Sequence, residues 1–362
     1  MTTITYYYRL FYILLSYPLL SFTYLTAIAE CPEFRTGQIT GTIQNSSINE
    51  ASGIASSRKN INVLWVHNDS GDSARVFAMN AQGQHLGVYN LSGVGATDYE
   101  DISIGPGPII GEDYLYIGDI GDNNAVRTGG VKVYRVQEPD VSENQSPVNV
   151  TLTEVETLIL KYPDGARDAE TLMVDPVYGD IYIVSKRETY SRVYVAFYPQ
   201  ASTTVMTFVA ELPWGWATGG DISPLRTEII IRGYGNASLW QIPDYGFLWN
   251  AFDSAPCTIP LVSEPQGEAI SFDAFGFGYF TLSEGLYQPI YYFARITQPP
   301  YLIIENPDEN VYFLSWETSG FFNLEADDSL LFELPEVIDV TGMTGYRYET
   351  TSEHKFFRLK QR

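Results

Sequence analysis

The chain has few cysteines, histidines and basic residues, and each shortage excludes a class of function. Two cysteines and three histidines in 362 residues are too few for a zinc ribbon or a histidine-rich zinc centre. Lysine and arginine number 21 against 44 aspartates and glutamates, which gives a net charge of −23 at pH 7. A surface this acidic repels phosphate backbones and anionic lipid, so we expect neither nucleic acid nor a membrane surface as a partner.

Motifs of the common catalytic centres are also missing. The sequence contains no P-loop, no dinucleotide-binding glycine motif and no nucleophile elbow for a Ser-His-Asp triad. Among the histidines, His67 is the candidate for catalysis, because it ends an expected strand beside Asp69 and Asp72. A structural histidine at a strand end is the alternative interpretation.

One long apolar run occurs, at the N-terminus. Arg9 precedes the apolar stretch 10–15, further apolar residues continue to Ala27, and Ala27-Ile28-Ala29 has the small-x-small pattern of a cleavage site. We predict a signal peptide over residues 1–29, with a retained membrane anchor as the alternative. The mature chain would then be secreted, either extracellular or periplasmic, with no membrane contact after cleavage. We expect a monomer in which Cys31 and Cys257 form a disulfide.

Repeats determine the expected fold. The chain is rich in tyrosine (27) and phenylalanine (19), which favour strands. A phrase such as DYEDISI or QGEAISF recurs five times at spacings of 48, 70, 50 and 48 residues, and two further strands follow each copy. A fourth strand closes four of the five units. The copies begin at Glu50, Asp98, Asp168, Thr218 and Gln266.

Four-stranded units of this length predict an all-β protein, a β-propeller over residues 31–297. We count five blades, and the 70-residue unit leaves six as the alternative. The last unit lacks a fourth strand, which the segment Gly37–Ile43 could supply to close the ring. After the stiff Pro299-Pro300 linker, residues 301–362 have a separate strand pattern that predicts a small C-terminal β-sandwich.

The repeated phrase predicts where a site would lie. The loop before the first strand and the loop after the second open on the same face of a propeller, so their polar residues should converge at one mouth of the central channel. The loops after the second strands would place Asp69, Arg187 and Glu284 at the same mouth. Oxygen ligands without His or Cys suit Ca²⁺ or Mg²⁺ rather than a transition metal, and we expect Ca²⁺ here. The candidate metal ligands are Glu100, Asp101, Asp119, Asp122, Asp168 and Asp221.

The candidate catalytic residues at the same mouth are Glu170, Glu268, Lys186, Arg232 and His67. In a hydrolase, carboxylates would hold the metal, Lys186 and Arg232 would hold the anionic substrate, and a metal-bound water would attack. Two alternatives remain open. The acidic residues could hydrogen-bond the backbone of neighbouring blades, and the basic residues could pair with neighbouring acids.

Several strings between Glu50 and Glu284 occur together and in order: LWVHNDSGD, YEDISIGPGP, YLYIGDIGDN, YPDGARDAETLMVDP and QGEAI. Together they resemble a family of exported bacterial β-propeller proteins that has no assigned activity or catalytic residues. At the level of fold the chain also resembles phytase-like and esterase-like propellers, and this resemblance implies ester hydrolysis with bound calcium. The tail is similar to small C-terminal β-domains of secreted bacterial proteins.

Two functions follow as hypotheses. The first is a calcium-dependent hydrolase of phosphate or carboxylate esters acting on a small molecule. The second is a non-catalytic extracellular module that binds glycan or protein, in which the metal is structural. Propellers host both kinds of function, so the fold does not choose between them.

Overall fold

A computed structural model describes residues 31–243, 245–296, 303–308, 311–316, 322–327, 336–349 and 356–361. The predicted signal peptide and the Pro299-Pro300 linker lie outside these residues. Within them, no helix is long and apolar enough to span a bilayer. Cys31 and Cys257 are both disulfide-bonded, as predicted.

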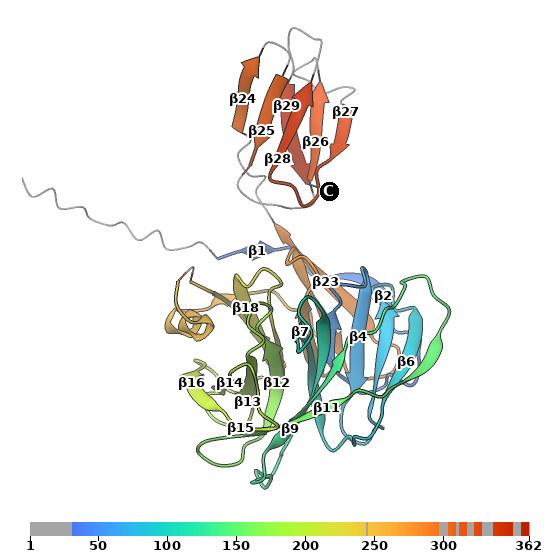
Figure 1. The fold of residues 1–362 in the computed structure, drawn as a ribbon, viewed down its shortest axis with the longest axis vertical. Coiled ribbons are helices and arrows are strands. Elements are labelled where there is room, and N and C mark those ends of the chain that lie inside the picture. Colours follow the sequence, from blue (N-terminus) through green and yellow to red (C-terminus); the bar gives the residue numbers. More distant parts are fainter. Residues whose placement is uncertain are drawn as a thin grey trace, which may run out of the picture. The chain divides into compact units, whose positions relative to one another are not determined.

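The main body is a five-bladed β-propeller, which confirms the predicted fold and the lower blade count. Neighbouring inner strands pack against one another in a closed ring, from β3 through β7, β12, β17 and β21 back to β3. Figure 1 shows β7 and β12 at its centre. The inner strands are almost wholly buried and span β3 (Ala51–Ser56), β7 (Tyr99–Pro106), β12 (Ala169–Val174), β17 (Gly219–Ile222) and β21 (Gly267–Phe272).

Each inner strand begins an antiparallel meander that runs outward. The second strands are β4 (Val63–Asn68), β8 (Asp113–Asp119), β13 (Ile181–Ser185), β18 (Glu228–Arg232) and β22 (Gly278–Ser283). The third strands are β5 (Arg75–Asn80), β9 (Val131–Gln137), β14 (Arg192–Ala196), β19 (Ala237–Gln241) and β23 (Pro289–Ile296). The fourth strands of the first four blades are β6 (His85–Leu91), β11 (Glu156–Lys161), β16 (Thr207–Glu211) and β20 (Cys257–Thr258).

The N-terminal segment closes the ring, as expected from the missing fourth strand of the last unit. Strand β2 (Gln38–Thr42) pairs antiparallel with β23, and the short β1 (Glu33–Phe34) pairs with the far end of β23. The last blade is therefore built from both ends of the propeller sequence. This pairing covers an edge that would otherwise be open to other chains.

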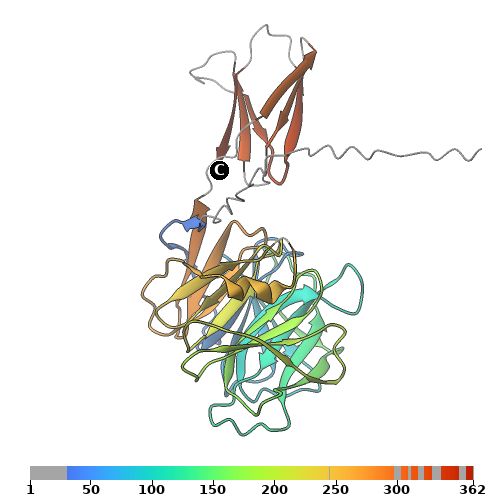
Figure 2. The ribbon, with the colours of Figure 1, turned by 90° about the vertical axis from the view of Figure 1, so that its left-hand side faces the viewer.

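Two strands were not anticipated. Strand β10 (Val148–Leu152) leaves the second blade and pairs parallel with β6 of the first, and β15 (Thr203–Val205) leaves the third blade and pairs parallel with β11 of the second. The 70-residue unit therefore contains an inter-blade strand in place of a sixth blade. The short 3₁₀ helix η1 (Leu248–Asp253) packs against β16 and β19 and is gold in Figure 2.

The C-terminal part forms two three-stranded antiparallel sheets. One contains β24 (Ile303–Asp308), β25 (Val311–Ser315) and β28 (Gly345–Glu349), and the other contains β26 (Phe322–Asp327), β27 (Glu336–Asp339) and β29 (Phe356–Gln361). Buried side chains from both sheets form one core, with Leu314 and Tyr348 from the first and Leu324 from the second. This arrangement is the predicted small β-sandwich.

Candidate functional site

Three glutamates occupy equivalent positions at the start of the inner strands. The register between first and second strand shifts by one residue in four blades, and the extra residue is Ser52, Glu100, Glu170 or Glu268. In the remaining blade Gly220 stands at this position and the register does not shift. A β-bulge turns its extra side chain out of the regular alternation. The three buried glutamates therefore occupy the same β-bulge position in three blades, at the mouth of the channel.

Asp101 and Asp221 lie one residue further along their strands and lock the blades together. Oδ2 of Asp101 accepts hydrogen bonds from the backbone N–H of Leu172 at 3.0 Å and of Gly220 at 3.4 Å. Oδ2 of Asp221 accepts from the Phe272 N–H at 2.9 Å. Burial raises the pKa of Asp221 to about 6 and that of Asp101 well above its usual range. Their contacts are those of the blade-locking alternative.

Asp119, Asp122 and Asp168 are also engaged by protein donors. Asp119 accepts a hydrogen bond from Arg127 at 2.9 Å and one from the Tyr134 hydroxyl at 3.2 Å. Asp168 joins two blades, because it accepts the Asp122 N–H at 2.8 Å. Asp122 in turn accepts the backbone N–H groups of the loop that follows it. These contacts leave the three carboxylates little capacity for a metal.

The basic side chains at the mouth are paired with acids. Arg187 contacts Asp168 at 2.5 Å, and Lys186 forms an ion pair with Glu170. Arg232 is fully buried below the surface and pairs with Glu264 at 2.8 Å. Arg232 is therefore not accessible to a ligand from solvent. A substrate anion would have to compete with a carboxylate for each of these cations.

A chain of side chains crosses three blades at the mouth. Lys186 donates to the Tyr234 hydroxyl at 3.0 Å, and that hydroxyl donates to Oε1 of Glu268 at 3.1 Å. Burial raises the pKa of Glu170 to about 8, and the adjacent ammonium of Lys186 opposes this rise. The second oxygen of Glu170, Oε2, is buried and has no hydrogen-bond partner in the described part of the chain.

His67 lies beneath the mouth and is fully buried. Its Nδ1 is 2.8 Å from the Asn68 carbonyl oxygen, and its ring stands edge-on to Tyr99 with 5.7 Å between centroids. Burial lowers its pKa to about 4, so the imidazole is neutral at physiological pH. These surroundings keep His67 away from solvent and from any ligand that enters by the mouth.

The structure brings Glu100 together with two carboxylates that were not among the predicted metal ligands. Oxygen atoms of Asp69, Asp98 and Glu100, here called the acidic trio, lie within 4.8 Å of one another. Asp69 follows the second strand of the first blade, and Asp98 begins the repeated phrase of the second. Burial raises the pKa of Asp69 to about 6 and raises those of Asp98 and Glu100. Recurring polar positions within blades indicated the mouth but could not show which pairs meet across blades.

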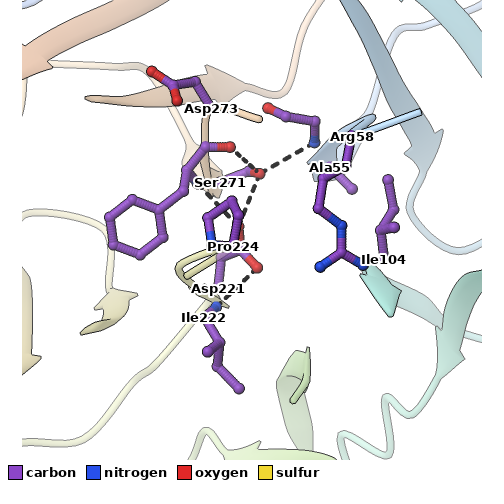
Figure 3. A pocket seen from close by; sticks show the side chains of 10 residues that line it. Ala55, Arg58, Ile104, Asp221, Ile222, Pro224, Ser271 and Asp273 are labelled. Atoms are coloured by element: carbon purple, nitrogen blue, oxygen red, sulfur yellow. Dashed lines mark hydrogen bonds between the residues drawn. The ribbon is translucent and has the colours of Figure 1, made fainter. Parts of the chain in front are cut away.

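A small pocket lies at the opposite end of the inner strands (Figure 3). There the Ser271 hydroxyl donates to Asp221 at 3.0 Å, and Arg58 lies on the other side of the pocket, paired with Asp113 at 2.7 Å. The pocket offers about 20 Å³, which is the space of a single water molecule. The acidic trio and its surroundings at the other mouth are therefore the candidate site.

Comparisons with known proteins add little on function. No protein family and no curated protein matches the sequence. Among solved structures, the chain is similar to one in the crystal structure of a nidogen–laminin complex, with a TM-score of 0.41 and 11% identity over 65% of this chain and 73% of that one. It is also similar to the Pan2 WD40 domain of Neurospora crassa, with a TM-score of 0.39 and 11% identity over 73% and 97%. These values bear on neither activity nor ligand.

Proposed function

We propose that the acidic trio binds a divalent cation of the Ca²⁺ type, and that the protein uses this cation to capture an oxygen-rich ligand outside the cell. The observation that carries the proposal is Glu100. Glu100 is 3% exposed, no described residue donates a hydrogen bond to its carboxylate, and the oxygens of two further carboxylates lie within 4.8 Å of it. A buried carboxylate without a donor is costly unless it is protonated or bound to a cation.

The residues present fit a hard cation. All three side chains of the trio offer carboxylate oxygens, which Ca²⁺ prefers, and the group contains no histidine or cysteine. Glu170 lies near the trio without belonging to it, and its charge contributes to the raised pKa of Glu100. Around the mouth, Trp216 and Tyr234 are about half exposed and could contact a ligand.

The proposal of a secreted protein rests on separate observations. The N-terminal sequence has the pattern of a signal peptide, both cysteines are disulfide-bonded, and the blade motifs resemble exported bacterial propellers. An extracellular setting would also supply calcium at the concentrations that weak extracellular sites require.

Calcium titration tests the cation site. We expect the wild-type protein, stripped with chelator, to bind Ca²⁺ in calorimetry and to melt at a higher temperature when Ca²⁺ is restored. Glu100→Gln should abolish both effects, whereas Glu154→Gln, which changes an exposed acid on the propeller, should leave them intact. Absence of Ca²⁺ binding by the wild-type protein would refute the proposal.

Hydrolysis of phosphate or carboxylate esters is the second candidate function, and Glu170 favours it. A cation at the trio would polarise an ester oxygen bound beside it. The unpartnered Oε2 of Glu170 could accept the proton of an attacking water, and Lys186 would hold Glu170 in place through Oε1. Tyr234 and Glu268 continue this chain and fix the position of the Lys186 ammonium.

Turnover on a panel of phosphate and carboxylate esters separates the two candidates. Hydrolysis predicts activity that chelator removes and that Glu170→Gln lowers by about 10² or more, with calcium binding retained. A protein that binds calcium but turns over no ester would be a binding module. Glu268→Gln should have a smaller effect, because Glu268 acts through Tyr234 and Lys186.

A further inference from the structure

A second cavity lies far from the acidic trio, between the third and fourth blades. Its volume is about 450 Å³, which is typical of small-molecule sites. Tyr178 and Asp180 come from the turn between β12 and β13, and Arg226 from the turn between β17 and β18. These turns lie at the opposite end of the inner strands from the mouth. The remaining wall is formed by Tyr182 of β13, by Phe197 and Tyr198 after β14, and by residues around the start of η1.

Aromatic rings make up most of the cavity wall and remain exposed. Tyr178, Phe197 and Phe247 are 61%, 44% and 62% exposed. Trp249 holds two of the rings in place: Phe247 stacks on it at 4.3 Å between centroids, and Phe197 meets it edge-on at 5.7 Å. Exposed aromatic rings gathered around one cavity are a recognised mark of a binding site.

The polar groups of the cavity have unused hydrogen-bonding capacity. Tyr182 is 1% exposed and lines the cavity, and its hydroxyl has no partner among the residues that the structure describes. One oxygen of Asp180 accepts the Tyr198 N–H at 2.8 Å, which leaves the other oxygen available. A ligand that offers donors and acceptors to these groups would gain hydrogen bonds on entering the cavity.

Arg226 contributes donors. Its Nε donates to Asp175 at 2.8 Å, and its guanidinium lies 4.9 Å from the centre of the Tyr178 ring. The terminal nitrogens of the guanidinium have no hydrogen-bond partner within the described ranges. Because Asp175 neutralises Arg226, the cavity carries no net positive charge that would select an anion. A cationic ligand would be repelled by the guanidinium of Arg226, which lies over the Tyr178 ring.

We infer that this cavity binds a neutral saccharide, at a site separate from the cation site. A pyranose ring has an apolar face of C–H groups that stacks on aromatic rings, and hydroxyls around its edge that both donate and accept. Phe247 and Tyr178 supply the stacking surfaces, and Asp180, Arg226 and the Tyr182 hydroxyl supply acceptors and donors. An apolar ligand would leave these polar groups without partners.

Saccharide binding can be measured directly on the full chain. The probes are cellobiose, maltose and N,N′-diacetylchitobiose, with binding followed by saturation-transfer NMR and by Trp fluorescence. We expect saturable binding of at least one probe. Phe247→Ala should weaken it about tenfold or more, and Tyr182→Phe should weaken it severalfold by removing one hydroxyl.

Tyr245→Ala is the matched control, because Tyr245 lies in the same loop, is 91% exposed and does not line the cavity. It should bind the probe as the wild type does, and so should the wild type in chelator. Failure of all three disaccharides to bind would overturn the inference. It would also be overturned if Phe247→Ala bound normally, or if choline or a proline-rich peptide bound in the cavity in place of the sugars.

Discussion

Gly121 lies against Glu100 so closely that a Cβ atom on residue 121 would stand 2.1 Å from Oε1 of Glu100. The same Cβ would be 2.4 Å from Oδ2 of Asp98. The loop after β8 therefore covers two members of the acidic trio with backbone that carries no side chain. The Gly121 N–H donates to the Asp98 carbonyl oxygen. A side chain at this position would have to displace the carboxylates.

Gly121→Ala should therefore disturb the trio with little effect elsewhere. We expect its affinity for Ca²⁺ to fall at least tenfold, because the ligand oxygens must move apart. Gly129→Ala is the matched control in the same loop, since a Cβ there meets nothing within 4 Å. Calorimetric titration of both variants checks this, and equal affinities would contradict the placement of the cation.

Stability without metal should fall as pH rises from about 6.5 to 8.5. Burial raises the pKa of Glu170 and Glu284 to about 8, so the folded state holds protons that the unfolded state releases near pH 4.5. Their ionisation on the way to pH 8.5 costs the folded state on the order of 2 kcal/mol, after allowance for the partly exposed Glu284. His67 opposes this trend by less than about 0.5 kcal/mol, because in the unfolded state its imidazole, with a pKa of 6.5, is still half protonated at the lower edge of this window.

Urea unfolding in chelator at pH 6.5 and 8.5 measures this difference. Glu170→Gln should flatten the profile, because the amide does not titrate. An unfolding free energy in the wild type that stays constant or increases across this window would show that these carboxyls are ionised in the fold at pH 6.5.

Asp101→Ala should destabilise the propeller and leave calcium binding intact. The substitution leaves the buried N–H groups of Leu172 and Gly220 without an acceptor, which costs about 2–4 kcal/mol even though a buried charge is also removed. Asp140→Ala is the control, because Asp140 forms an exposed pair with Lys59 worth less than about 1 kcal/mol. Urea melts and calcium titration together check this, and loss of calcium binding in the folded variant would instead make Asp101 a metal ligand.

Arg232→Met should lower the free energy of unfolding by about 3–5 kcal/mol, because it leaves the buried carboxylate of Glu264 without its counter-ion. The double variant Arg232→Met with Glu264→Leu should recover much of that loss, because no charge then remains buried. Lys59→Ala, whose partner Asp140 is exposed, should change stability by less than about 1 kcal/mol. Thermal melts measure all three, and a mild effect of Arg232→Met would contradict a purely structural pair.

The predicted architecture depended on signals that are local in the chain. The repeated phrase, the strands after it and the unpaired segment Gly37–Ile43 were enough to predict five blades closed by an N-terminal strand. Four blades are contiguous meanders, and the last lacks only its fourth strand. The sequence pattern did not predict the two inter-blade strands, β10 and β15. Their partners lie in a preceding blade, and strand pairing across blades leaves no fixed spacing in the sequence.

The sequence by itself determined that acidic side chains recur at the start of inner strands, and Glu100, Glu170 and Glu268 do converge on one mouth. Only the tertiary structure decided which carboxylates are free. Asp101 and Asp221 bind backbone N–H groups of other blades, whereas Glu100 meets Asp69 and Asp98 without a donor. The physical reason is that a carboxylate's role depends on which donors reach it, and here those donors come from segments tens of residues away.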